Sequence, residues 1–242
     1  MLFEEPLVAG RLVRRYQRFF AEAELDDGRL VVAHCPNPGS MKGCTEDGAR
    51  VWLRPCAGAG RRLSWSWELA EVDGGFVVVN TTRANRVVAE ALASGAIAEL
   101  AGYDRVTAEP AGGEGTRFDF LLERTTPGDS PRRCWLEVKS ATMDTGGGVT
   151  AFPDSVTMRG TRHLEELAAR ARRGSRAALL FCASRSDTQV VRPADEIDEI
   201  YGDALRRAVR AGVEVLAYRC DISTLGITLG TRVSVDLGCM AA

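Results

Sequence analysis

Three residues of this chain have the types and order that metal-dependent cleavage of phosphodiester bonds needs. Asp119 comes first, and Glu137 and Lys139 follow two positions apart at the end of an apolar run. The lysine is unusual here, because Lys42 and Lys139 are the only lysines among 31 Lys+Arg residues. An arginine stays protonated, whereas a partly buried lysine can shift its pKa and help to activate water. The pattern predicts a hydrolytic centre with two carboxylates and one lysine.

The residues around these side chains read as two β-strands, over 117–122 and 134–139. Because side chains alternate between the faces of a strand, each strand has an apolar face and a face that carries charges. In the first strand the apolar face would hold Phe118, Phe120 and Leu122, and the other face Arg117, Asp119 and Leu121. Glu137 and Lys139 share one face of the second strand. If the strands pair, Asp119 can approach both.

Two ionised carboxylates that lie close together repel each other, and a hard divalent cation removes that penalty. Mg²⁺ binds through one or two carboxylates and keeps several waters, which suits a phosphate substrate. Such a metal polarises a phosphoryl oxygen and lowers the pKa of bound water, and Lys139 can orient that water. Mg²⁺ or Mn²⁺ is therefore the expected cofactor. From the strand pattern alone, the alternative is a salt-bridge cluster on a solvated face of the sheet.

The order of the expected elements divides the chain into two parts. Residues 1–80 read as about five short strands with turn signals, which favours a small barrel of the oligonucleotide-binding (OB) type. Residues 81–242 follow the order α-β-β-β-α-β-α-β, which indicates an α/β domain with a mixed sheet. Helices are expected over 85–100, 161–173 and 196–211, and strands over 106–109, 117–122, 134–140, 177–183 and 213–218. A polar loop is expected over 124–133.

Composition and charge narrow the class of protein. The chain is 45% hydrophobic and 26% charged, as globular proteins are. The formal net charge of −2 gives no general argument for nucleic-acid binding, so such a surface must be a local cluster of arginines. The acidic start over 1–6 and the short apolar runs argue against a signal peptide and a membrane span. Cysteines without a Cys-x-x-Cys pair indicate reduced thiols and a cytoplasmic protein.

The expected barrel contains two segments with nucleic-acid-binding chemistry. The loop over 34–43 combines glycine N–H groups with Lys42 and can cradle a phosphate. A structural turn stiffened by its prolines is the equal alternative. Trp65 and Trp67 lie at i and i+2 on one strand face, where they can stack on unpaired bases. Core packing is the alternative that the pattern favours for this tryptophan pair.

A basic group stands at the start of the helix expected over 161–173. Arg159 and Arg162, with His163, can bind phosphate there, helped by the free N–H groups of a helix start. Asp154 and Ser155 can instead cap that helix without any contact to substrate.

With these residues placed, the chain resembles the sugar fermentation stimulation protein A (SfsA) family over nearly its full length. Several separate motifs in one order make the resemblance more specific than a Glu-x-Lys pair alone. The motifs are His34-Cys35-Pro36-Asn37 with Gly39-Ser40-Met41, Trp67-Glu68-Leu69, Ala84-Asn85-Arg86 with Glu90-Ala91, Arg117-Phe118-Asp119-Phe120, Glu137-Val138-Lys139-Ser140, Phe152-Pro153-Asp154, and Arg159-Gly160 with His163-Leu164 and Glu166-Leu167.

The resemblance implies an OB-like domain over 1–80 and, over 81–242, a domain similar to the PD-(D/E)XK, restriction-endonuclease-like nucleases. Carried over by position, Asp119 and Glu137 would be the metal ligands and Lys139 the catalytic lysine. Glu90, on the first helix, would be an additional acid near the metal. The residues expected to contact nucleic acid are Asn37, Ser40, Lys42, Arg117, Arg159, Arg162 and His163.

The leading hypothesis is a Mg²⁺- or Mn²⁺-dependent nuclease that acts on DNA, with RNA as an open second substrate. A rival is a DNA-binding regulator of sugar-use genes that has the nuclease fold but does not cleave. A sugar-linked enzyme is the weakest alternative, because only the family name suggests it. The expected partner is nucleic acid and not a membrane, and a homodimer is left open.

Overall fold

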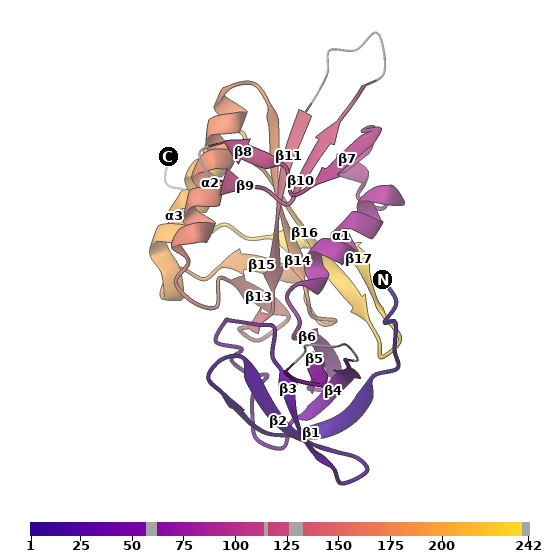
Figure 1. Ribbon diagram of the computed structural model, residues 1–242. Helices are drawn as coiled ribbons and strands as arrows, with labels where there is room; N and C mark the ends of the chain where they lie inside the picture. Colours follow the sequence, from indigo (N-terminus) through magenta and orange to yellow (C-terminus); the bar gives the residue numbers. More distant parts are fainter. Residues whose placement is uncertain (57–61, 114–115, 126–132, 239–242) are drawn as a thin grey trace.

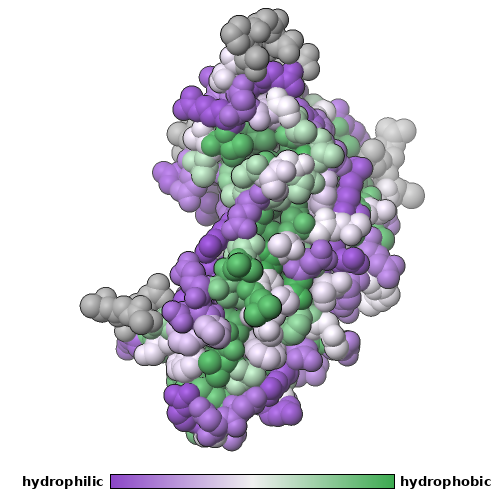
Figure 2. Space-filling view, turned by 90° about the vertical axis from the view of Figure 1, so that its right-hand side faces the viewer, coloured by the Kyte–Doolittle hydropathy of each residue, from purple (hydrophilic) through white to green (hydrophobic). Residues whose placement is uncertain are grey.

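The computed structural model describes residues 1–56, 62–113, 116–125 and 133–238 of the chain. In Figure 1 the N-terminal strands form a lobe at the bottom, and the helices lie in a larger lobe above it. Figure 2 shows the same two lobes from the side, with an outline that narrows between them. The loop expected over 124–133 lies mostly outside the described residues.

The N-terminal lobe is a closed barrel. Its strands are β1 (Val8–Tyr16), β2 (Phe20–Leu25), β3 (Leu30–His34), β4 (Arg50–Pro55), β5 (Trp65–Val72) and β6 (Gly75–Val78). They follow the order β3-β2-β1-β4-β5-β6, and an additional pairing of β3 with β5 closes the ring. Trp67 is fully buried in the barrel core, where its Nε1 donates to the carbonyl oxygen of Leu69. The OB-like barrel predicted from the strand pattern is confirmed.

The larger lobe contains a mixed six-stranded sheet. Its strands in spatial order are β17 (Ile227–Arg232), β16 (Glu214–Ile222), β14 (Arg176–Ala183), β11 (Arg133–Ala141), β10 (Phe120–Glu123) and β7 (Arg105–Ala108). The central strands β11, β14 and β16 run parallel, and the outer pairings are antiparallel. Strand β14 is an apolar run because layers of side chains cover both of its faces. The predicted α/β domain with a mixed sheet is confirmed.

Helices cover the sheet on both faces (Figure 1). Helix α1 (Arg83–Ala93) packs on one face, and α2 (Met158–Arg172) and α3 (Asp195–Arg210) pack on the other. The helix expected over 85–100 ends early, because Gly95 adopts a φ of +71° that no helix continues through. A short 3₁₀ turn, η1 (Ala98–Leu100), follows it. None of the described helices has the length and apolar character that crossing a membrane requires.

Several short strands were not expected from the sequence. A second sheet contains β12 (Met143–Asp144), β13 (Val149–Phe152), β15 (Val190–Pro193) and β18 (Ser234–Val235), and β8 (Ala111–Gly113) pairs with β9 (Thr116–Arg117). Strands of two to four residues are too short to show alternation. The second sheet brings the larger lobe into contact with the barrel, because β13 ends beside the barrel. There the carboxylate of Asp154 accepts a hydrogen bond from the backbone N–H of Met41 at 3.3 Å.

The predicted alternation along 117–122 is wrong at one point. The chain leaves the ladder between β9 and β10 and bends at Asp119. Phe118 therefore packs into the core under α2 and α3, whereas Phe120 and Leu122 pack into the core under α1. The three residues do not share a face, because a bend resets the direction in which side chains point. The alternation along β11 is unbroken, and Glu137 stays on the face opposite Leu136 and Val138.

A buried ion-pair network joins the lobes at Glu68 of β5, whose side chain is 0% exposed. Its carboxylate accepts hydrogen bonds from Arg54 at 2.9 Å, from Arg83 at 2.7 and 2.8 Å, and from Asn80 at 3.0 Å. Arg54 belongs to the barrel, and Arg83 is the first residue of α1. One carboxylate thus ties the barrel to the helix that packs on the larger sheet.

Candidate functional site

Pairing between β10 and β11 brings Asp119 to the sequence Glu137-Val138-Lys139. Phe120 lies opposite Leu136 in this antiparallel pair. Asp119 Oδ2 accepts a hydrogen bond from the backbone N–H of Val138 at 2.7 Å, and Oδ1 accepts one from the side chain of Asn85 at 2.6 Å. Two strands and helix α1 therefore fix the position of this carboxylate.

Glu137 is the centre of the cluster and is 3% exposed. Its Oε1 accepts a hydrogen bond from Lys139 Nζ at 2.6 Å and is also in close contact with His163 Nδ1. His163 Nε2 accepts from Arg159 Nε at 3.4 Å, so with a proton on Nδ1 the ring accepts from Arg159 and donates to Glu137. The other carboxylate oxygen, Oε2, is buried and has no hydrogen-bond partner among the described residues. Glu137 therefore keeps an acceptor that a ligand could use.

Asp119 and Glu137 differ in proton affinity, because their surroundings shift the two pKa values in opposite directions. Burial raises the pKa of Asp119, and the neighbouring charge of Glu137 raises it further. Burial alone would also raise the pKa of Glu137, but the hydrogen bond from His163 and the charge of Lys139 outweigh it. The pKa of Glu137 therefore lies below its ordinary value. Glu137 stays ionised, and Asp119 is the carboxylate whose charge is poorly compensated.

A cleft of about 360 Å³ opens between the lobes next to this cluster. We call it the lobe cleft. The barrel side supplies Arg18 and residues 37–39, and the other side includes Asn85, Val138 and Lys139. Asp119 and Glu137 do not line the cleft themselves. They lie behind its wall, because the groups that bind them (Asn85, the N–H of Val138 and Lys139) are part of that wall.

Arg15 holds the barrel side of the lobe cleft in place. Its guanidinium donates to four backbone carbonyl groups, those of Arg18, Asn37, Gly39 and Ser40, at 2.8 to 3.5 Å. The side chain thus ties the turn after β1 to the loop after β3. Sequence reasoning missed this role, because Arg15 stands in a run of arginines and nothing local distinguishes it.

The predicted contacts in the loop over 34–43 have different environments. Asn37 lines the lobe cleft but is 3% exposed, and its Oδ1 accepts from the N–H of Gly39 at 2.9 Å. The hydroxyl of Ser40 is buried without a partner among the described residues. Lys42 is exposed. The loop is therefore a turn held by its own hydrogen bonds, with Lys42 exposed on it. Binding of a phosphate by this loop stays a prediction.

At the start of α2 the structure separates three predicted contacts. Arg159 and Arg162 are exposed, whereas His163 is 3% exposed and lies against Glu137. His163 is therefore placed to orient Glu137 and not to meet a phosphate on the surface. The helix cap is Thr157, whose hydroxyl accepts from an N–H of the first turn at 3.1 Å. Asp154 does not cap this helix.

Two predicted residues are not brought to the cluster. Glu90 is half exposed and pairs with the N-terminal amine of Met1 at 2.7 Å. Asn85 is the α1 residue that reaches Asp119, and five positions along a helix turn Glu90 to another side. Arg117 is exposed and pairs with Glu109 at 3.2 Å.

The chemistry of Asp119 and Glu137 fits a hard divalent cation. Both supply oxygen donors, one oxygen of Glu137 is an orphaned buried acceptor, and the charge of Asp119 is under-compensated. Within the described part of the chain, no three His, Cys, Asp or Glu side chains form a metal-binding group. A cation here would complete its coordination with water or substrate oxygens, which is how Mg²⁺ is usually held.

Comparisons with known proteins agree over nearly the whole chain. The family model described as "SfsA N-terminal OB domain" matches residues 13–79, and "Sugar fermentation stimulation protein RE domain" matches residues 82–226. A sugar fermentation stimulation protein homolog of Pseudomonas aeruginosa is 50% identical over 98% of this chain and 100% of its own. A homolog of Geobacter sulfurreducens is 47% identical with the same coverage. The solved structure of Pyrococcus furiosus SfsA in complex with Ca²⁺ has a TM-score of 0.86 and 25% identity over 98% of both chains.

Proposed function

The chain belongs to the sugar fermentation stimulation protein (SfsA) family, and we propose that it is a divalent-metal-dependent nuclease. It would hydrolyse phosphodiester bonds of DNA, with RNA as a second substrate. The observation that carries the proposal is the cluster of Asp119, Glu137 and Lys139 behind the wall of the lobe cleft. The solved Pyrococcus furiosus SfsA is a complex with Ca²⁺. A relative thus binds a cation that prefers oxygen ligands, which supports a metal role for the carboxylates.

Each residue of the cluster has a separate role in this proposal. Asp119 and Glu137 would hold Mg²⁺ or Mn²⁺, and such a cation polarises a phosphoryl oxygen and lowers the pKa of bound water. Asn85 and the N–H of Val138 orient Asp119 from two sides. Lys139 lines the cleft, where its ammonium can orient the attacking water and neutralise charge on the phosphate.

Binding of the sugar–phosphate backbone of the nucleic acid would use cations on both sides of the lobe cleft. Arg18 lines the cleft from the barrel and is exposed. Lys42 is exposed on the neighbouring loop, and Arg159 and Arg162 are exposed at the start of α2. Contacts of this kind release counterions from the nucleic acid, so affinity should fall steeply as salt rises.

A cleavage assay tests the proposal. Purified wild-type protein with Mg²⁺ or Mn²⁺ is expected to cut single-stranded DNA, duplex DNA or RNA, and a Glu137→Ala/Lys139→Ala double variant is expected to cut none of them. Glu165→Gln is the control, because Glu165 is an exposed carboxylate on α2 that does not line the lobe cleft. The proposal fails if the wild type cleaves these substrates no faster than the double variant does.

A second function is a DNA-binding regulator that keeps the fold without cleavage. One observation favours it: Lys139 and His163 both occupy Oε1 of Glu137, and a third acidic ligand is absent from the part of the chain that the structure describes. Wild-type protein that binds DNA as tightly as an Asp119→Ala variant, with no cleavage by either, would decide for the regulator. The name of the family points in the same direction, towards control of sugar fermentation.

A further inference from the structure

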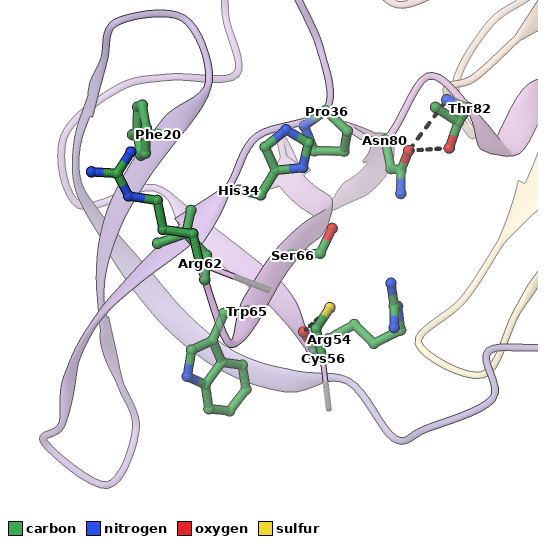
Figure 3. A pocket seen from close by; sticks show the side chains of 11 residues that line it. Phe20, His34, Pro36, Arg54, Cys56, Arg62, Trp65, Ser66, Asn80 and Thr82 are labelled. Carbon is green, nitrogen blue, oxygen red and sulfur yellow. Dashed lines mark hydrogen bonds between the residues drawn. The ribbon is translucent and has the colours of Figure 1, made fainter. Parts of the chain in front are cut away.

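A second cavity lies on the barrel, apart from the lobe cleft. We call it the barrel pocket. It has a volume of about 510 Å³ and opens among the ends of β2, β3, β4 and β5 (Figure 3). A narrow contact separates it from the lobe cleft: the N–H and the hydroxyl of Thr81 both donate to the carbonyl oxygen of Pro36, at 3.3 and 3.0 Å. Pro36 lines the barrel pocket, and its neighbour Asn37 lines the lobe cleft. The two cavities are therefore adjacent.

Three rings line the barrel pocket. Phe20 is partly buried at the start of β2, His34 is exposed at the end of β3, and Trp65 is partly buried at the start of β5. Trp67, two positions further along, is fully buried and belongs to the core. Trp65 packs against that core as well, but it is only partly buried and lines the pocket. Aromatic faces at such a pocket are groups on which unpaired bases stack. Tyr16 already stacks on Phe20 and Arg29 lies over the ring of Trp65, whereas the ring of His34 is exposed.

Polar groups without protein partners stand among these rings. The guanidinium of Arg62, the ring nitrogens of His34 and the hydroxyl of Ser66 line the pocket, and none of them has a hydrogen-bond partner among the described residues. Arg54, by contrast, donates a hydrogen bond to Glu68. A planar cation and free donors and acceptors next to rings can bind a phosphate and the edge of a base. This combination can hold both parts of a nucleotide, the base against the rings and the phosphate at the cation.

We propose that the barrel pocket binds one unpaired nucleotide of a nucleic-acid strand, with its base on the ring of His34 or Trp65 and its phosphate at Arg62. The strand then continues over the contact between Pro36 and Thr81 into the lobe cleft. A base inside a duplex cannot enter such a pocket, because its edge is paired and both of its faces are stacked. The proposal rests on the nuclease function and specifies its substrate as a single strand or an unpaired segment.

Equilibrium binding with a labelled oligonucleotide of about 12 nucleotides, within the site size of such barrels, tests this. EDTA prevents cleavage, and a duplex of the same sequence serves as the second ligand. His34→Ala should weaken single-strand binding by about tenfold, because one stacked base contributes on that order. Arg62→Ala should weaken it as well, through the lost phosphate contact, and duplex binding should not change in either variant. Arg14→Ala is the control: this exposed arginine pairs with Glu22 and lines neither cavity.

Tryptophan fluorescence supplies a readout that a structural defect would not reproduce. Trp65 lines the pocket whichever of the two rings holds the base, so the single strand should quench the wild-type emission. Trp65→Phe should abolish that change while keeping a folded far-ultraviolet spectrum. Because the ring of His34 is exposed, His34→Ala keeps the test valid even if a variant of Trp65 folds poorly.

Three results would overturn the pocket assignment. One is single-strand binding by His34→Ala and Arg62→Ala at the wild-type affinity. Another is an equal loss of duplex binding in both variants. The third is a free nucleoside monophosphate that binds as tightly as the strand, which would make the pocket a small-molecule site. Failure of the nuclease proposal looks different: wild type would not cleave, yet strand binding would still depend on His34.

Discussion

Lys139→Ala is expected to lower the cleavage rate by about 10²–10³-fold, the loss seen when one preorganised donor is removed from a developing charge. The side chain of Lys139 is 13% exposed, and its Nζ lies 2.6 Å from Glu137 Oε1 at the wall of the lobe cleft. No other described lysine is near the cluster, since the second lysine, Lys42, is on the barrel loop. The rate is measured at saturating metal, and affinity for DNA is measured separately in EDTA. Arg207→Ala, at an exposed position on α3, is the control for loss of one positive charge.

Lys139→Arg tests whether position 139 needs only a positive charge or needs the amine of a lysine. A guanidinium is larger, planar and always protonated, and the space beside Glu137 and His163 is confined. The arginine variant is therefore expected to lose most of its activity as well. Full activity in Lys139→Arg would show that position 139 needs only a positive charge, and it would contradict the role in orienting water.

Glu68→Ala is expected to lower the free energy of unfolding by about 3–5 kcal/mol, the loss typical when one member of a buried ion-pair network is removed. The substitution leaves Arg54 and Arg83, 19% and 16% exposed, without their shared carboxylate. It also cuts the link between the barrel and α1, the helix whose Asn85 holds Asp119. Urea unfolding followed by circular dichroism measures the change.

Glu22→Ala is the matched control for Glu68→Ala. Glu22 pairs with Arg14 on the barrel surface, with side chains 25% and 66% exposed. A solvated pair of this kind contributes about 0–1 kcal/mol. If Glu68→Ala and Glu22→Ala destabilise the protein equally, the buried network is not what joins the lobes.

The long elements of this fold are predictable from sequence because their apolar periods are long. Strand β14 is apolar from Ala177 to Ala183. Helices α2 and α3 each have one polar and one apolar face along about four turns. The second sheet was missed because its strands have two to four residues. The expected helix over 85–100 was too long because the conformation of Gly95 outweighed the alanine-rich pattern.

The candidate site was predictable only where local pattern determines direction. Alternation along β11 places Glu137 and Lys139 on one face, and the antiparallel pairing with β10 brings Asp119 close. The bend at Asp119 has no local signal. Asn85 and His163 reach the carboxylates from 34 and 26 residues away, so their contacts depend on how α1 and α2 pack and not on any motif spacing.

The metal role of Asp119 and Glu137 is tested most directly by an anomalous difference map from a crystal soaked in Mn²⁺. The proposed function predicts a peak within coordination distance of a carboxylate oxygen of each residue, with Glu137 using the Oε2 that has no partner among the described residues. The peak should vanish in Glu137→Gln. A wild-type crystal with saturating Mn²⁺ and no peak between these carboxylates would contradict the metal-dependent mechanism.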